Sequence, residues 1–241
     1  TDLYRDIGTH SAARKSLELA TQLILLQPHG LAELPQHLRG KAKVILQSAV
    51  PPARRLQPLR NAFEMCVAGH LRGVKDPFRA AMAARQLPAQ SRIQITHIGA
   101  ALTESMGRRA EAEMARNPRY RWLGDVSLPR ARQLIARSRA LVLSSKMEGG
   151  ANVVSEALVA GVPVLASRIS GSIGMLGDDY RGYFEVGPTR ELAGLMRRCE
   201  DDAEFYADLR KHCVERAKLF CPARELAAWR ELLESRGIGC A

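Results

Sequence analysis

The feature that most constrains the fold of this sequence is an alternation of short apolar segments with helix-length amphipathic segments after residue 60. Apolar or β-branched runs that fit strands occur at 63–68, 92–98, 121–123, 140–144, 162–167 and 182–186. Parallel strands need long crossover connections, which are usually helices, so this order is typical of βαβ units around a parallel sheet. The sequence therefore predicts an α/β fold.

The first 50 residues carry a shorter version of the same pattern, with a helix near 11–20 and strands at 21–26 and 43–48. Two strands and one helix are too few to cover both faces of a parallel sheet. Together with the absence of an initiating methionine, this suggests the second half of a domain whose first half is missing. Residues 51–58 (PPARRLQP) contain three prolines, which fit neither a helix nor a sheet interior and indicate a stiff linker.

The remaining boundaries follow from helix signals. Helical pattern runs from Thr189 to about Ser235, with an expected break at Pro222. Asp76 followed by Pro77 is typical of an N-cap and a first helical position, and Gly161 is expected to end a helix that starts near Asn152. We therefore expect a partial N-terminal domain at 1–50, a linker at 51–60, a C-terminal domain at 61–222 and a C-terminal helix at 223–241.

Composition excludes several classes of protein. No apolar run approaches the ~20 residues that span a bilayer, and the opening residues TDLYRD lack the basic start and apolar core of a signal peptide. The five cysteines are odd in number and show neither CxxC nor zinc-ligand spacing. A disulfide framework and a metal site are therefore not expected, and a reducing cytoplasm is the predicted location.

The positive charge is concentrated in one block. The net charge is +11, and residues 52–146 contain 16 Arg and 2 Lys against six acidic residues. A positive field there would concentrate an anionic ligand. The alternative is that 29 Arg against 7 Lys reflects an arginine-rich composition with most guanidinium groups in solvent. A nucleic-acid partner is disfavoured because aromatic interleaving and nucleic-acid-binding motifs are absent.

The most informative stretch for chemistry is 144–156 (SSKMEGGANVVSE), where a strand ends, a glycine pair follows and a helix begins. The first turn of that helix, at Asn152, offers unsatisfied N–H groups at the carboxyl edge of the sheet, which is a phosphate site. Gly149 and Gly150 let the backbone approach a ligand closely. Glu148 stands just before this turn, where its carboxylate can accept hydrogen bonds from sugar hydroxyls.

Glu156 lies farther along the same helix, in the apolar run 153–159, where a charge needs a partner or a ligand. The alternative is that Ser155 and Glu156 form the solvated face of a short surface helix. Two glutamates eight residues apart, on either side of a glycine pair at a strand-to-helix turn, favour the functional interpretation.

The second stretch is 69–77 (GHLRGVKDP), again a glycine loop between a strand and a helix. Lys75 is expected at the positive end of a helix, where a cation is disfavoured by roughly 0.3–1 kcal/mol. Lys75 and Arg72 together make sense if an anion such as a diphosphate bridges them. The alternatives are that Lys75 simply pairs with Asp76, and that His70 is a hydrogen-bonded structural residue.

Other motifs are absent. No GxGxxG fingerprint occurs, since residues 171–177 (GSIGMLG) have the wrong spacing for one, which argues against a dinucleotide oxidoreductase. The chain also lacks an Asp-x-Asp pair, a GxSxG elbow and a P-loop.

At these residues the chain resembles the donor-binding half of GT-B glycosyltransferases of the GT4 type, over about residues 63–198. Glu148 and Glu156 match the two-glutamate motif of that family, residues 69–75 match its phosphate loop, and 160–167 (AGVPVLAS) match the strand that follows. The resemblance implies two Rossmann-like domains with parallel sheets, the N-terminal one incomplete in this chain. It also implies a metal-independent, UDP-sugar-dependent transferase without a cofactor.

The family's residue roles follow from the same resemblance. It implies that Glu148 contacts the donor sugar and Glu156 the nucleotide ribose, and that the backbone near Val126 reads the base. The implied diphosphate and donor contacts are Lys75, Arg72, Gly149, Gly150, Ala151, Asn152 and Val153. The chain departs from the family where His70 replaces the usual arginine, for which Arg72 is expected to compensate, and where Gly149-Gly150-Ala151 replaces the usual Gly-Phe-Gly.

Several runs are more similar still to the selenosugar synthases of selenoneine biosynthesis. They are 69–79 (GHLRGVKDPFR), 117–124 (NPRYRWLG), 147–158 and 179–184 (DYRGYF), and the opening TDLY fits an interior segment of that family. The resemblance implies transfer of N-acetylglucosamine or glucose from a UDP-sugar to selenophosphate, forming a C–Se bond. The alternatives are a GT4-type transferase that acts on a carbohydrate or lipid hydroxyl, and a non-catalytic UDP-sugar-binding module.

Overall fold

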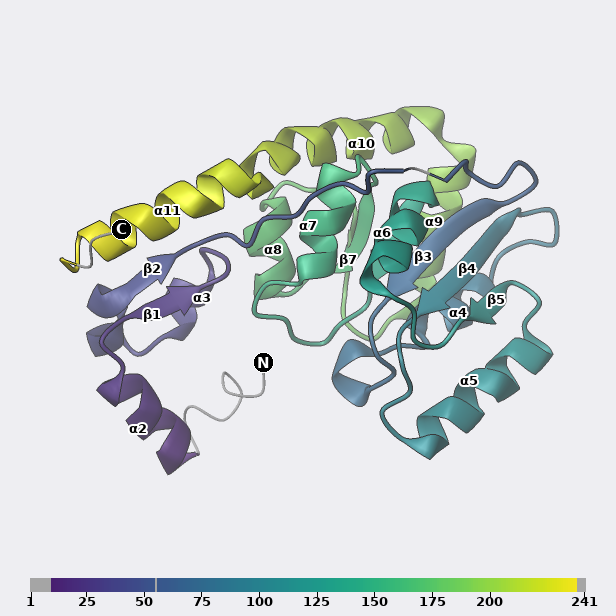
Figure 1. Cartoon of the computed structure of the whole chain (residues 1–241). Coiled ribbons are helices and arrows are strands. Elements are labelled where there is room, and N and C mark those ends of the chain that lie inside the picture. The colour runs from purple at the N-terminus through teal and green to yellow at the C-terminus, as the bar shows by residue number, and fades with distance from the viewer. Residues whose placement is uncertain (1–9, 55, 238–241) are drawn as a thin grey trace.

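The computed structural model describes residues 10–54 and 56–237 and shows two parallel sheets in this part of the chain (Figure 1). The smaller sheet pairs β1 (Leu23–Leu25) with β2 (Ala42–Val44). Helix α2 (Ser11–Leu19) precedes it, and α3 (Gly30–Glu33) and the 3-10 helix η1 (Gln36–Lys41) connect its strands. The opening residues TDLY and Cys240, interpreted above, lie outside the described residues.

The larger sheet has six parallel strands in the order β5–β4–β3–β6–β7–β8. They are β3 (Phe63–Ala68), β4 (Ile93–Ile98), β5 (Tyr120–Trp122), β6 (Ala140–Leu143), β7 (Val164–Ser167) and β8 (Tyr183–Phe184). The order reverses between β3 and β6, as in a Rossmann-type sheet. The expected α/β class with parallel sheets is confirmed, and each of the six expected strand segments after residue 60 overlaps one of these strands.

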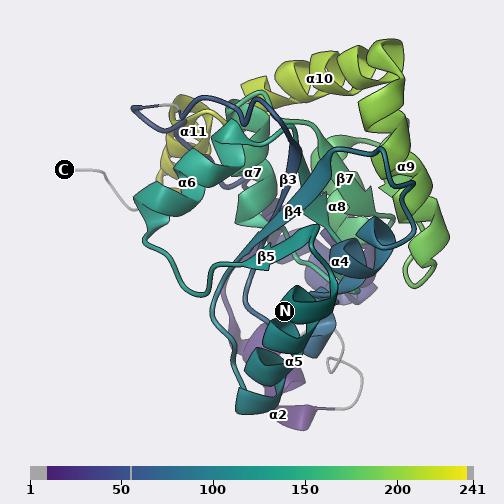
Figure 2. The ribbon, with the colours of Figure 1, turned by 90° about the vertical axis from the view of Figure 1, so that its right-hand side faces the viewer.

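Helices cover both faces of the larger sheet. They are α4 (Arg79–Ala84), α5 (Glu104–Arg116), α6 (Leu128–Arg137), α7 (Asn152–Val159), α8 (Ser170–Leu176) and α9 (Thr189–Asp201). Figure 2 shows α6 and α7 on one side of the strands and α4 and α9 on the other, in agreement with their packing contacts. Because both faces are covered, β6 and β7 are buried along their whole length and read as continuous apolar runs.

The chain crosses between the two sheets twice. Residues 45–62 join β2 to β3 and include the proline-rich segment; the part that the structure describes holds neither helix nor strand, so β2 is shorter than the expected 43–48. After α10 (Ala203–Ala217) and η3 (Lys218–Phe220), helix α11 (Pro222–Glu234) returns to the smaller sheet (Figure 1). There the backbone N–H of Ser48 donates to Glu225 at 2.8 Å.

The prediction of one helical run broken only at Pro222 is wrong at Asp202. Helix α9 ends at Asp201, and the Asp202 carboxylate accepts a hydrogen bond from the Phe205 N–H at 2.9 Å. Asp202 is therefore the N-cap of α10, because its side chain satisfies one of the free donors of the first turn.

The prediction that Asp76 caps a helix beginning at Pro77 is also wrong. Residues Gly73–Lys75 form a 3-10 turn, and Asp76 follows it in the left-handed region with φ of 43°. Helix α4 begins only at Arg79, whose guanidinium bonds the Asp76 carboxylate at 2.7 Å. A carboxylate that already pairs with Arg79 has a role in the loop rather than in a helix cap.

Candidate active site

The candidate site lies where the strand order reverses, at the carboxyl ends of β3 and β6. In open α/β sheets a crevice forms at this point, because the connections from the two central strands leave in opposite directions. Here the loop after β3 and the loop after β6 are bonded together. The N–H of Lys146 donates to the carbonyl of Val74 at 2.8 Å, and the Ser144 hydroxyl donates to the carbonyl of Asp76 at 2.9 Å.

Two of the expected site residues meet across these loops. The Lys75 ammonium donates to Glu148 Oε1, and the Ser145 hydroxyl donates to the same oxygen at 2.5 Å. The Glu148 side chain is only 6% exposed and that of Lys75 22% exposed. The alternative that Lys75 merely pairs with Asp76 is therefore wrong, because Lys75 pairs with Glu148.

The electrostatic environment of Lys75 also differs from the expected one. Lys75 was expected at the positive end of a helix, but it ends the 3-10 turn Gly73–Lys75, well before α4 begins. A cation is favoured at the C-terminal end of a helical turn. The position of Lys75 therefore carries no electrostatic penalty of the expected kind, and its ion pair with buried Glu148 is what identifies it as a site residue.

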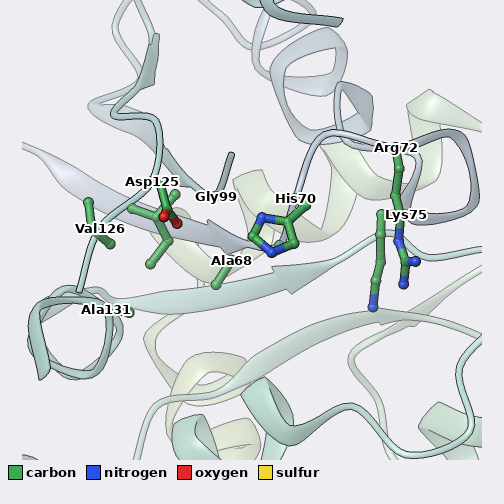
Figure 3. Close-up of a pocket in the computed structure, with 10 residues that line it drawn as sticks. Ala68, His70, Arg72, Lys75, Gly99, Asp125, Val126 and Ala131 are labelled. Carbon is green, nitrogen blue, oxygen red and sulfur yellow. The ribbon is translucent and has the colours of Figure 1, made fainter. Parts of the chain in front are cut away.

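A cleft of about 330 Å³ opens beside this ion pair. Its lining residues come from the loops after β3, β4 and β5 and from the start of α6, and they are Ala68, Gly69, His70, Arg72, Lys75, Ile98, Gly99, Asp125, Val126 and Ala131. Figure 3 shows Arg72 and Lys75 together at one end, Asp125, Val126 and Ala131 at the other, and His70 between them. The cleft therefore has a cationic end, and an opposite end where the Asp125 carboxylate lies beside the apolar residues Val126 and Ala131.

Arg72 supplies the second cation of the cleft. It lies next to Lys75 in Figure 3, and among the residues that the structure describes its guanidinium makes no hydrogen bond or ion pair. Many other arginines of the basic block do have partners, such as Arg79 with Asp76 and Arg137 with buried Glu64. Arg72 thus keeps its donors available to a ligand in the cleft.

The two histidines near the cleft have structural bonds. Nδ1 of His70 accepts the backbone N–H of Ala100 at 3.0 Å, which joins the loops after β3 and β4. His97 is fully buried, between the Tyr120 hydroxyl at 2.9 Å and the Gly69 carbonyl at 3.1 Å. Burial lowers the pKa of His97 to about 4, so this ring is neutral near neutral pH.

Glu156 is buried, at 8% exposure, and its carboxylate accepts a hydrogen bond from Nε of Arg132 at 3.0 Å. Ser155 is fully buried as well, and its hydroxyl donates to the Gln47 carbonyl at 3.0 Å. The alternative of a solvated helix face at Ser155 and Glu156 is therefore wrong. Glu156 has a charged partner on α6, next to the cleft residue Ala131, whereas Glu148 is held from the β3 loop, so the two glutamates have separate partners.

Helix α7 begins at Asn152, as expected, and Gly161 follows its end with a positive φ of 70°. Ala151 precedes the helix in extended conformation, so the N–H groups of Asn152 and Val153 belong to the first turn, where helix geometry leaves donors unsatisfied. Gly150 has a neighbour that the sequence did not indicate. A Cβ built on it would lie 2.5 Å from Cβ of Leu26, beyond the end of β1.

Sequence reasoning missed several residues of the site. Asp125 follows the Leu123-Gly124 segment, and the rule that ligands bind at the carboxyl ends of strands could have pointed to it. Ser145 donates a hydrogen bond to Glu148, and Arg132 donates one to Glu156. Only the folded structure brings the members of each pair into contact. No signal in the sequence could have identified those two pairings.

The comparisons with known proteins agree with this architecture. The family model of glycosyl transferases group 1 matches residues 54–220, which is well over half of the chain. The chain therefore belongs to this family, and the protein is a glycosyltransferase. No curated protein matches the sequence significantly.

Solved structures of glycosyltransferases share the fold at low sequence identity. HepE from Anabaena, in complex with UDP and glucose, has a TM-score of 0.81 and 18% identity over 98% of this chain and 70% of its own. A glycosyltransferase from Rickettsia africae has a TM-score of 0.76 and 14% identity, covering 98% of this chain and 67% of its own. The lipopolysaccharide outer core galactosyltransferase WaaB has a TM-score of 0.71 and 16% identity, covering 95% and 66%. The chain thus has the GT-B fold.

The described residues lack two further features. None of the helices there is long and apolar enough to cross a membrane. Within residues 10–54 and 56–237, no cluster of three or more His, Cys, Asp or Glu side chains is arranged to hold a metal ion. The four cysteines of this part, Cys66, Cys199, Cys213 and Cys221, are free thiols.

Proposed function

We propose that the protein transfers N-acetylglucosamine or glucose from a UDP-sugar to selenophosphate and so forms the C–Se bond of a selenosugar in selenoneine biosynthesis. The observation that carries the donor half is the pairing of Lys75 with Glu148 at the crevice beside a cationic cleft. HepE, which shares the fold, binds UDP and UDP-glucose. The acceptor half rests on the resemblance of the sequence runs to selenosugar synthases.

Donor binding uses the two ends of the cleft. In this proposal the diphosphate binds Lys75, Arg72 and the N–H groups at the start of α7, which together neutralise the charge that develops on departing UDP. The base lies toward Val126. Glu148 orients the sugar through its hydroxyls, and Glu156, fixed by Arg132, contacts the ribose.

The acceptor chemistry fits the groups around the cleft. The selenium anion attacks the anomeric carbon, the C–Se bond forms, and the bond from that carbon to the UDP oxygen breaks with its electron pair going to UDP. The product then carries phosphate on selenium, and hydrolysis of its P–Se bond by water gives the selenosugar and inorganic phosphate. A selenium anion is a strong nucleophile near neutral pH, so little general-base help is needed. Both ring nitrogens of His97 are already bonded, and its pKa of about 4 makes it a weak base. We place this reaction in the reducing cytoplasm, where thiols and selenium anions persist.

A hydroxyl acceptor is the second candidate. WaaB, which shares the fold, is a lipopolysaccharide outer core galactosyltransferase. Mass spectrometry after incubating the full-length protein with a panel of UDP-sugars distinguishes the candidates. We expect a selenosugar product with selenophosphate. Product only with sugar or lipid hydroxyl acceptors would assign the second candidate, and UDP binding without any transfer would make the protein a non-catalytic UDP-sugar-binding module.

The role of Lys75 has its own test. Lys75→Ala is expected to lower turnover by about a hundredfold, because it removes a cation that meets charge developing in the transition state. Lys146→Ala is the matched control, since Lys146 is an exposed lysine two residues from Glu148. Circular dichroism checks that both variants fold. Unchanged turnover in folded Lys75→Ala would remove Lys75 from the mechanism.

A further inference from the structure

The N-terminal segment reaches the loop that carries Glu148. Leu26 and Gln27 follow directly after β1, and Leu26 packs so closely on Gly150 that a Cβ there would lie 2.5 Å from Cβ of Leu26. Helix α3, the next element, packs against α8 of the larger sheet's layer, and Figure 1 shows the two facing each other. The segment that follows β1 therefore contacts Gly150, which is two residues from Glu148 in the sequence.

Helix α8 contacts both Glu148 and Gln27 through two of its glycines. Gly171 and Gly174 are three residues apart and so lie on the same side of the helix. A Cβ on Gly171 would lie 2.1 Å from the carbonyl oxygen of Glu148, and a Cβ on Gly174 would lie 2.8 Å from Cβ of Gln27. Real Cβ atoms do not approach other atoms this closely, so only glycine fits at these two positions. The backbone of Glu148 and the side chain of Gln27 therefore both pack against this face of α8.

Gln27 is an unusual residue to find at such a contact. It is 2% exposed, and its Oε1 has no hydrogen-bond partner among the residues that the structure describes. A buried, unpaired amide oxygen costs about 1–3 kcal/mol, so an apolar side chain of similar size would be more stable here. Packing stability alone therefore does not account for a glutamine at this position.

We propose that Leu26 and Gln27, together with the glycine face of α8, form a clamp that sets the position of Glu148 relative to the donor sugar, with Gln27 as a positioning residue. This proposal rests on the proposed role of Glu148 in holding the sugar. The Glu148 carboxylate is fixed from one side by Lys75 and Ser145. Its main chain is fixed from the other side by Gly171 and, through Gly150, by the N-terminal segment.

The clamp predicts a separation between nucleotide binding and sugar transfer. Displacing a reacting or orienting group by about 1 Å can cost about a hundredfold in rate. Gly171→Ala is therefore expected to lower kcat by about a hundredfold. The loss of UDP affinity should be at least about tenfold smaller than the loss of kcat, because the cleft residues Lys75 and Arg72 lie on the loop after β3 and not on the segment that Gly171 contacts. Gly194→Ala is the matched control, since a Cβ on this helical glycine meets nothing within 4 Å.

Two further variants provide the second arm. Gly174→Ala should also lower kcat, since the new methyl group collides with Gln27, and Gln27→Ala should lower kcat by at least about tenfold because it removes the positioning side chain. UDP affinity is measured by calorimetry and folding by circular dichroism for every variant. Normal kcat in folded Gly171→Ala, an equal loss of kcat and UDP affinity, or normal kcat in folded Gln27→Ala would each overturn the clamp.

A binding measurement keeps the clamp distinguishable from the acceptor assignment. The gain in affinity of UDP-N-acetylglucosamine over UDP reports contacts to the sugar without any transfer. If the wild-type protein gives no product with selenophosphate but loses this gain in Gly171→Ala, the clamp stands and the selenophosphate assignment fails. If the gain is the same in both proteins, the clamp is wrong whatever the acceptor.

Discussion

Burial of His97 predicts a pH dependence of stability that can be traced to one ring. Its environment fixes the tautomer: the Gly69 carbonyl only accepts, so Nε2 carries the proton, and Nδ1 accepts the hydrogen bond from the Tyr120 hydroxyl. Both nitrogens are satisfied only while the ring is neutral. Burial lowers the pKa of His97 from the usual 6.5 to about 4.

The sign follows from proton binding in the two states. Between pH 6.5 and 4 the unfolded chain takes up a proton at residue 97 and the folded protein does not, so lowering the pH favours unfolding. The stabilisation is fully present above pH 6.5 and is lost as the pH falls toward 4. Each pH unit in this window is worth about 1.4 kcal/mol, which gives about 3 kcal/mol across the window and about 2 kcal/mol down to pH 5.

The assay compares urea unfolding of the wild-type protein and His97→Gln at several pH values from 7.5 to 5. The difference between their unfolding free energies should shrink by about 2 kcal/mol as the pH falls, because the variant lacks the titrating ring. His10→Gln, which removes an exposed imidazole, controls for the loss of a histidine as such. A pH-independent difference between wild type and His97→Gln, or a His97 NMR titration midpoint near 6.5, would refute the reasoning.

Two further predictions concern stability. Arg132→Ala should lower the unfolding free energy by about 1–3 kcal/mol, because buried Glu156 loses its charged partner; the range is reduced for the partial exposure of Arg132. Arg108→Ala is the control, since it breaks the exposed pair with Glu104 and should change the unfolding free energy by less than about 0.5 kcal/mol. Equal losses in the two variants by chemical denaturation would contradict this account. Gly194→Ala should raise the unfolding free energy by about 0.5–1 kcal/mol, since it lies in the interior of α9 with open space at the Cβ position. A lower thermal midpoint for this variant would count against the helix-propensity argument.

The sequence was most informative where local pattern and burial coincide. The apolar segments at β6 and β7 are buried on both faces, so hydrophobicity alone located them to within two residues. The helix start at Asn152 was also predictable, because a glycine pair separates it from the preceding strand. Both successes depend on residues adjacent in the chain.

The failures have a common physical cause, which is that the deciding partner is distant in sequence or competes locally. Asp76 looks like a helix cap, but its bond to Arg79 and its left-handed conformation place it in a turn instead. Glu156 was expected to need a partner, yet nothing identified Arg132, which is 24 residues away. The sequence around Gly171 contains no recognisable motif. Glycine is needed there because the Glu148 carbonyl packs against it, and Glu148 is distant in the sequence.

Helix α11 has a mechanical consequence for the two sheets. The chain passes from the small sheet to the large one through residues 45–62, and α11 comes back to it, with Glu225 bonded to Ser48 and Glu231 paired with Lys43. A body attached at one point can swivel in any direction, whereas a body attached at two points turns only about the line that joins them. Even a turn about that line would break the packing of Leu26 on Gly150 and of α3 on α8, so the small sheet cannot turn freely against the large one.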